Sequence, residues 1–393
     1  MSAQLPVSIV VPTRNRAACL VSLLETLERY QVEDGHCFQL IVADNSDDDS
    51  LRSRIASSPI AIDYLYSSEQ LSVVENFNRT VPLIRGEFVC FIGDDDLVTP
   101  RLFELVRLMQ AKGIDAANVA PTLKCLYFWP GVTHKRWGEV GGRLYLSRPT
   151  GLVRPIDLGS ALRESRLRIS DGPQALPRAY FGVVSARCIA EVTNRYGELF
   201  GGVSPDIFSS RLLAEVVVQC VSVDLPFIAP GASKSSTSAG RAERTDVGKL
   251  RDNDHTGRFK DLSWDPRVPE FYAPFTVWAQ SLLQAERLVG TTLSSWAFPY
   301  LYAKCLLFSR GHSQQVWQSV ARHSAPALTA VQTILSVGVV AISYLIEKLP
   351  LLVRRAPGGA DDCFERLDSS DAATQRLSAQ TVHIPLRYGD ATY

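Results

Sequence analysis

The chain has 393 residues, enough for one large domain or two of ordinary size. Hydrophobic residues make up 46% and charged residues 21%, as in an ordinary globular protein, and 41 basic residues balance 41 acidic ones. A net charge of zero excludes the broad positive field typical of nucleic-acid-binding proteins, and the sequence contains no DNA- or RNA-binding motif.

The cysteines and the N-terminal residues predict the cellular compartment of the protein. Eight cysteines are scattered without a CxxC pair or a zinc-binding spacing, mostly among apolar neighbours, as buried free thiols are. A reducing compartment fits them better than an oxidising one. The first residues, MSAQLPVSIVVPT, lack a basic region and reach a strand-like run at once, which argues against a signal peptide. We therefore expect a cytoplasmic protein, free or peripheral at the cytoplasmic face of a membrane.

The first 120 residues alternate between strand-like and helix-like patterns. Continuous apolar runs predict strands buried on both faces, and leucines at helical spacing predict helices between them. Thr99 and Pro100 predict the cap and first turn of a further helix. This order predicts an α/β fold with a mainly parallel, Rossmann-like sheet and right-handed crossovers. The predicted strands are 7–11, 38–43, 60–66 and 87–92, and the predicted helices are 17–30, 71–85 and one from residue 100 onward.

Polar segments follow three of these strands. They are residues 13–16, 44–48 and 94–96. In parallel sheets, ligands bind just beyond the carboxyl ends of the strands, so the three segments should face one crevice. Asp94, Asp95 and Asp96 repel one another unless a cation is present. Carboxylates are the ligands that Mg²⁺ and Mn²⁺ prefer, and such a cation would stabilise a departing diphosphate. A solvated acidic turn or a helix cap is the competing interpretation.

Four motifs in order resemble the family 2 glycosyltransferases, which have the GT-A fold. These are VSIVVPTRNRAACL, LIVADNSDDDS, SVVENFNRTVPLIRGEF and the closing FIGDDDL. The resemblance covers about residues 5–112 and extends weakly to about 230. It implies transfer of a sugar from a nucleoside diphosphate (UDP, GDP, dTDP or CDP) to an acceptor hydroxyl. Many relatives carry an acid where this chain has Gly93. The run from LSVVENFNR to GEFVCFIGDDD resembles a branch of the family that moves abequosyl-type deoxysugars onto bacterial lipid-linked glycans.

The resemblance implies roles for individual residues. Asp44 would hydrogen-bond the base, with Ser46 on the same loop, while Asn76 and Arg79 would approach the nucleotide or the sugar. Asp94, Asp95 and Asp96 would bind the donor and a Mn²⁺ or Mg²⁺ ion, with Asp96 the first choice of metal ligand. An exposed polar helix face is the competing interpretation of Asn76 and Arg79. The residues that would line the base pocket are Pro12, Thr13 and Arg16.

An inverting enzyme needs a general base to take the proton of the acceptor hydroxyl. Asp206, in GGVSPDIFSSRLL, opens a predicted helix at 205–218, as the base of the family does; Asp171 is the rival. The competing interpretation is that Asp206 caps its helix. No QxxRW motif of processive synthases occurs in the sequence, so one sugar per acceptor is expected.

A polar stretch follows, at 231–257, and reads as a mobile loop. Relatives often close such a loop over the donor. His255 could then complete the metal shell, and Lys234 or Arg241 could neutralise the diphosphate. A disordered polar loop without these roles is the alternative.

The C-terminal third is aromatic and apolar, and no charge occurs between residues 325 and 346. The length permits a membrane span, but polar residues, Pro326 and Gly338 favour a helix buried in the domain or lying on a membrane surface. We expect a lipid-linked or membrane-proximal saccharide as acceptor, in bacterial surface polysaccharide or glycolipid assembly.

The expected organisation has four parts. A GT-A domain spans 1–232, with a nucleotide-binding half at 1–112 and an acceptor half at 113–232. A linker follows at 233–260, then a helical region at 261–355 and an irregular tail at 356–393. Two other functions stay open: a nucleotidyltransferase that makes the sugar nucleotide, against which the glycine-free PTRNRAAC argues, and a non-catalytic binder of nucleotide sugars.

Overall fold

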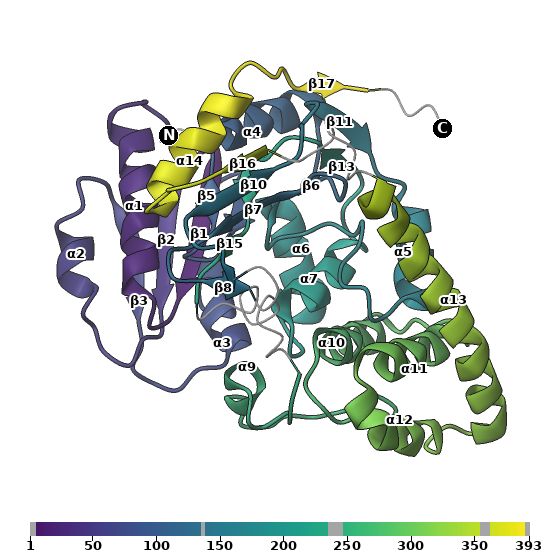
Figure 1. The fold of residues 1–393 in the computed structure, drawn as a ribbon. Coiled ribbons are helices and arrows are strands. Elements are labelled where there is room, and N and C mark those ends of the chain that lie inside the picture. The colour runs from purple at the N-terminus through teal and green to yellow at the C-terminus, as the bar shows by residue number, and fades with distance from the viewer. Residues whose placement is uncertain (1–4, 135–137, 235–246, 354–361, 390–393) are drawn as a thin grey trace.

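A computed structural model describes residues 5–134, 138–234, 247–353 and 362–389 (Figure 1). Its centre is a mixed, mostly parallel sheet of nine strands. In sheet order, these are β17 (Arg387–Tyr388), β11 (Leu152–Pro155), β13 (Cys220–Val223), β6 (Ala116–Val119), β12 (Gly182–Ser185), β4 (Phe88–Phe91), β1 (Val7–Thr13), β2 (Gln39–Asp44) and β3 (Ile62–Tyr66).

Helices cover both faces of the central strands, as continuous apolar runs require. Every residue of β1 and β2 is buried. Along β1 the side chains alternate, so that Ile9 and Val11 join the core under one set of helices and Val10 joins the core on the other face. The first set comprises α1 (Ala17–Val32) and α4 (Arg101–Lys112); the second comprises α3 (Val73–Asn78), α6 (Ala186–Tyr196) and α7 (Pro205–Leu213).

Smaller sheets and a helical region complete the fold. The second sheet has the order β15 (Gly231–Ala232), β7 (Cys125–Phe128), β10 (Arg143–Leu146) and β16 (Asp362–Phe364). Two short pairs join β14 (Ile228–Ala229) to β5 (Leu97–Val98) and β8 (Thr133–His134) to β9 (Gly138–Glu139). The remaining helices are α2 (Arg52–Ala56), α5 (Leu158–Leu167), α9 (Asp254–Gly257), α10 (Pro274–Val289), α11 (Ala297–Phe308), α12 (Ser313–Val320), α13 (Pro326–Val353) and α14 (Ser370–Thr381).

The predicted helix at 71–85 is shorter in the structure. Helix α3 ends at Asn78, and only a 3₁₀ turn, Val81–Leu83, follows it. Pro82 lies inside this turn, and a proline in a helix interior has no N–H to donate and clashes with the preceding turn. The start is well defined, because Ser72 and Glu75 form a reciprocal capping box.

The prediction of an irregular tail at 356–393 is wrong for its described part. Strand β16 pairs with β10, strand β17 pairs with β11, and α14 packs beside α1 (Figure 1). Ala373 and Leu377 of α14 are fully buried, and Asp371 is 2.7 Å from Arg29 of α1. Ser369 caps the helix through the N–H of Ala372. Helix α14 has too few apolar positions for a helical pattern to stand out in the sequence. Its stability comes from contacts with α1, which is far away in the chain.

Candidate active site

The carboxyl ends of β1, β2 and β4 meet at one edge of the sheet, as predicted. Thr13 and Asp44 are register partners at the ends of β1 and β2. Thr13 Oγ1 donates to Asp94 Oδ2 over 2.5 Å, which ties the end of β1 to the acids behind β4. Asn15 continues the link, because its N–H donates to Ser46 Oγ over 2.8 Å. All three polar segments therefore meet at one edge of the sheet.

Arg16 is the counter-charge of the acids. Its Nη2 lies 2.7 Å from Asp94 Oδ1, and its Nη1 lies 3.1 Å from Asp95 Oδ2. The side chain of Asp94 is fully buried and that of Asp95 is 6% exposed, so the guanidinium offsets charges that water cannot reach. Arg16 thus supplies positive charge at the place where the sequence predicts a metal ion.

Backbone and hydroxyl donors hold the remaining carboxylate oxygens. Asp96 accepts from the N–H of Gly93 over 2.6 Å and from the N–H of Gly231 over 3.0 Å. Asp95 accepts from both the N–H and the hydroxyl of Ser233, over 3.1 and 2.6 Å. Strand β15 and the residue after it therefore close over the acids. The sequence reasoning missed Ser233, although it lies beside Lys234 in the polar stretch already selected.

Burial shifts the titration of two of these acids. Burial raises the pKa of Asp94 to about 7, and the charge of Asp95 adds to this, while Arg16 and Thr13 act in the opposite direction. Burial and Asp95 also raise the pKa of Asp96, against the two backbone N–H groups. Both carboxyls therefore hold a proton more tightly than a free aspartate does, and a cation bound here would release it.

The donor set suits a hard divalent cation. Asp94 Oδ1 is buried, its close partner is Arg16 Nη2 at 2.7 Å, and each carboxylate oxygen has more than one lone pair. The oxygens of Asp94, Asp95 and Asp96 can therefore ligate an ion that displaces Arg16. Over the described residues, however, no ready-made group of three or more metal-binding side chains is present. The side chain of His255 lies outside the described residues; its backbone is in α9.

Asp44 is fully buried at the end of β2, and its carboxylate is already engaged. Oδ1 accepts from the N–H of Ser46 over 2.8 Å, and Oδ2 accepts from Tyr64 over 2.8 Å. This network fixes the direction of the carboxylate. Pro12, the next predicted lining residue, is a buried member of β1 itself.

Asn76 and Arg79 bind the backbone of β2 and β3 near the carboxyl ends of these strands. Asn76 Nδ2 donates to the carbonyl of Ala43 over 3.0 Å, and Arg79 Nη2 donates to the carbonyl of Asp44 over 3.1 Å and to that of Leu65. Both side chains therefore bind strand backbone instead of facing open solvent, as an exposed polar helix face would require.

Tyr180 connects the acids to the second predicted catalytic element. Its backbone forms a β-bridge with Phe91, and its side chain is half-buried. Burial raises the pKa of Tyr180, and the charges of Asp96, Asp95 and, more weakly, Asp206 raise it further. Asp206 lies in the first turn of α7, half-buried, where it accepts a hydrogen bond from Ser204. Tyr180 thus lies within electrostatic reach of both groups. Nothing in the sequence pattern singled it out.

The rival base, Asp171, is held elsewhere. Lys304 Nζ lies 2.6 Å from its Oδ1, and the hydroxyl of Tyr300 donates to Oδ2 over 2.9 Å. Both partners belong to α11. This carboxylate therefore anchors the helical region to the sheet domain.

The polar stretch after β15 returns to the second-strand loop. Lys234 is exposed, and Arg241 lies outside the described residues. Arg258 Nη1 lies 3.2 Å from Asn45 Oδ1 and 3.3 Å from the carbonyl of Leu71. Arg258 was not predicted, and it brings a positive charge to the loop after β2.

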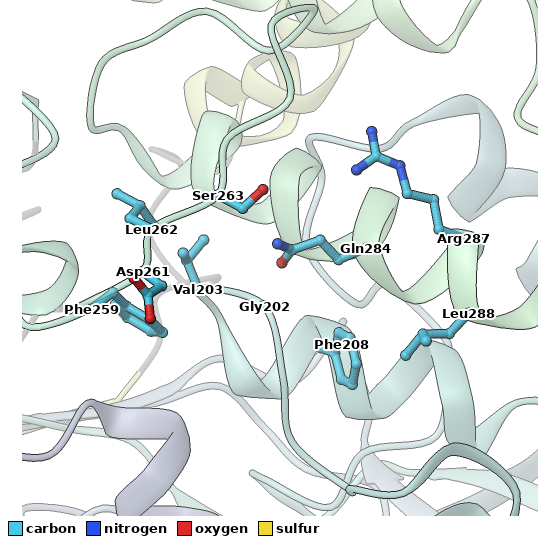
Figure 2. Close-up of a pocket in the computed structure, with 10 residues that line it drawn as sticks. All are labelled: Gly202, Val203, Phe208, Phe259, Asp261, Leu262, Ser263, Gln284, Arg287 and Leu288. Atoms are coloured by element: carbon cyan, nitrogen blue, oxygen red, sulfur yellow. The ribbon is translucent and has the colours of Figure 1, made fainter.

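A cavity of about 440 Å³ lies beside the start of α7 (Figure 2). The 202–203 turn and Phe208 line one side, the 259–263 segment a second, and α10 a third. The amide of Gln284 from α10 points into it, and its Oε1 is buried with no hydrogen-bond partner in the described chain. The cavity therefore offers an apolar wall and an acceptor atom, and two of its lining residues, Val203 and Phe208, flank Asp206 in the sequence.

Comparison with known proteins supports the reading of the sheet edge. Residues 8–158 match the model of the family "Glycosyl transferase family 2". No curated protein matches the chain.

Among solved structures, the chain is similar to residues 1–349 of S. aureus TarS, determined in complex with UDP-GlcNAc, at 12% identity, with 98% of both chains covered and a TM-score of 0.46. It covers 44% of a longer TarS chain. It is also similar to the mannosyltransferase PcManGT from Pyrobaculum calidifontis, in complex with GDP-Man and Mn²⁺, at 16% identity, 97% and 87% coverage and a TM-score of 0.39. The part of the chain that carries the sheet edge, residues 8–158, is thus similar to the family 2 glycosyltransferases.

Proposed function

We propose that the protein is an inverting glycosyltransferase that moves one sugar from a nucleoside diphosphate to an acceptor hydroxyl. The observation that carries this proposal is that two carboxylate sites act electrostatically on Tyr180: the buried acids behind β4 and the half-buried Asp206 at the start of α7. Inversion by a single displacement needs a donor site and a general base facing each other across one anomeric carbon.

The nucleotide would bind over the ends of β1 and β2. Asp44, with its orientation fixed by Tyr64 and the N–H of Ser46, would accept a hydrogen bond from the base. Pro12, Thr13 and Ser46 would form the wall of this pocket, and Arg16 would turn from the acids to the diphosphate. Asn76 and Arg79 would act indirectly, by holding the backbone at Ala43 and Asp44 in place.

Asp94, Asp95 and Asp96 would hold Mn²⁺ or Mg²⁺ with the donor, and His255 would complete the ligand set. Such an ion supplies Lewis-acid stabilisation of the departing diphosphate. Its affinity would rise with pH up to about pH 7, because protons on Asp94 compete with it and the pKa of Asp94 is raised to about 7.

Asp206 would take the proton from the acceptor hydroxyl. It is half-exposed, so an acceptor can reach it, and the hydroxyl of Ser204 orients it. The oxygen of the acceptor then bonds to the anomeric carbon while the bond from that carbon to the diphosphate oxygen breaks. The proton ends on Asp206 and the electron pair on the leaving diphosphate.

The acceptor would enter along the cavity of Figure 2, where Gln284 Oε1 can accept a hydrogen bond from a sugar hydroxyl. We propose a saccharide that is lipid-linked or close to a membrane, at the cytoplasmic face, in assembly of a bacterial surface polysaccharide or glycolipid. A deoxysugar donor of the abequosyl type remains part of this proposal on the strength of the quoted motifs.

A panel of UDP-, GDP-, dTDP- and CDP-sugars tests the function. We expect one class to raise the melting temperature when Mn²⁺ is present and to be hydrolysed slowly without acceptor. Release of pyrophosphate from a nucleoside triphosphate and a sugar phosphate would instead support a nucleotidyltransferase. Stabilisation without hydrolysis or transfer to any acceptor would support a non-catalytic binder.

A further inference from the structure

Helix α13 carries its large apolar side chains on the outside. One described helix of the chain, Pro326–Ile346, is long and apolar enough to cross a membrane, yet only 22% of its most apolar stretch is buried. Eight aliphatic residues are more than half exposed. They are Leu328, Val331, Ile334, Leu335, Val339, Ile342, Leu345 and Ile346, and we call them the outer row.

The protein-facing side of the same helix is small and mostly polar. Thr329, Thr333, Ser336 and Val340 are its buried residues, and they face α11 and α12. The two threonines satisfy their hydroxyls within the helix: Thr333 Oγ1 donates to the carbonyl of Thr329 over 2.8 Å, and Thr329 Oγ1 donates to that of Ala325 over 3.0 Å. These two hydroxyls thus need no water.

This arrangement is the reverse of a surface helix in water. An amphipathic helix of a soluble protein buries its large apolar residues and exposes polar ones. Helices in lipid instead pack through small residues and hydroxyls and present large aliphatic side chains to the acyl chains. A contiguous row of this size on a monomer marks a contact with something apolar.

Charge and aromatic residues around the row identify the partner. No acidic residue occurs from 287 to 346, whereas Arg310 and Arg322 are exposed in that segment. Arg322 lies just before α13, and Arg310 follows Phe308, whose ring lies 5.3 Å from that of Tyr344 near the other end of the helix. Phe308, Trp317 and Tyr344 are between 43% and 45% exposed, as aromatic residues at a membrane interface are.

We infer that the outer row lies in the acyl region of an anionic bilayer, with α13 parallel to the membrane plane. A parallel orientation follows because one side of α13 is packed on α11 and α12, and so only the outer side can contact lipid. A second copy of the chain fits less well, because it would set Arg310 and Arg322 of each copy against the segment 287–346, which contains no carboxylate. This inference deepens the membrane-proximal part of the proposed function.

Vesicle flotation of the full chain tests it. We expect the protein to float with vesicles of phosphatidylcholine and phosphatidylglycerol, to float less with phosphatidylcholine alone, and to be released in part by salt. The double variant Leu335→Glu/Ile342→Glu should lower the partition coefficient by at least about tenfold, because two side chains leave the acyl region. Its hydrolysis of the soluble donor should stay unchanged, so a failure of membrane binding and a failure of the sugar-transfer proposal are distinguishable.

The matched control is Val32→Glu/Val382→Glu. It makes the same chemical change at two apolar residues outside the outer row, which are 59% and 57% exposed. Leu335 and Ile342 are exposed to the same extent, 58% and 59%. The control should float like the unmodified protein. Flotation of the outer-row variant at the level of the control would overturn the inference. So would a dimer in sedimentation velocity without lipid that the outer-row variant, and not the control, dissociates.

Discussion

At the end of β4 the protein buries carboxylates, whereas along α13 it exposes large aliphatic side chains. The acids are compensated within the chain, by Arg16, Ser233 and the backbone N–H groups of Gly93 and Gly231. The outer row of α13 has no comparable compensation among the described residues. The acids therefore have their partners within the described chain, whereas the outer row points to a partner outside it.

The largest effect should come from breaking the base. Asp206→Asn keeps the shape of the side chain and removes its ability to take a proton, so kcat should fall by about 10²–10⁴-fold. Donor-induced thermal stabilisation should be unchanged, because Asp206 does not contact the donor in our proposal. Asp171→Asn is the control, and it should lower the melting temperature through loss of the Lys304 pair while leaving most activity. A reversed ranking of the two variants would move the base to Asp171.

The second prediction concerns the pH dependence of the acid region. The pKa of Asp94 is raised from 3.8 to about 7 in the folded protein, so the folded state binds a proton more tightly than the unfolded state. Its stabilising contribution is therefore complete below about pH 4 and is lost as the pH rises through about 7, by up to about 4 kcal/mol. Urea unfolding in EDTA should show this slope in the unmodified protein and a flatter one in Asp94→Asn. Equal slopes would contradict the burial argument.

The third prediction concerns the closure of β15 over the acids. A Cβ on Gly231 would lie 1.7 Å from the carbonyl oxygen of Asp95, so Gly231→Ala must displace the backbone that holds Asp96. We expect a loss of about 2–3 kcal/mol in the free energy of unfolding and weaker donor binding. Gly248→Ala, which meets nothing within 4 Å, is the matched control and should be close to neutral.

The smallest effect should come from the tail. Asp371→Asn removes the ion pair with Arg29, in which the two side chains are 18% and 24% exposed. Since water partly screens this pair, we expect a loss of only about 1 kcal/mol, seen as a small shift in melting temperature. An unchanged hydrogen-exchange pattern in α14 would show that burial of Ala373 and Leu377 alone holds the helix.

The sequence predicted the sheet edge well, because apolar runs and the polar residues that follow them are local patterns. The strands, their order along the chain and the convergence of residues 13–16, 44–48 and 94–96 all follow from such patterns. The predicted helix at 71–85 is too long, because Pro82 lies in the 3₁₀ turn that replaces its second half.

The contacts that complete the site were not predictable in this way. Tyr180, Ser233 and Arg258 come from distant parts of the chain, and each is an unremarkable residue in its own segment. The partners of Arg16 are equally far away in the chain. The sequence suggested that Arg16 lines the base pocket, whereas in the folded chain it forms ion pairs with Asp94 and Asp95. The inverted face of α13 also required the structure, since a run of apolar residues does not say which side is covered.

The central claim is that the acids behind β4 receive a nucleotide sugar together with a divalent cation. Calorimetric titration of the preferred nucleotide sugar, with Mn²⁺ and with EDTA, tests it in the unmodified protein and in Asp94→Asn. We predict binding that depends on Mn²⁺ in the unmodified protein and is at least about tenfold weaker in the variant. Equal binding with and without the ion, or equal binding by both proteins, would contradict the account.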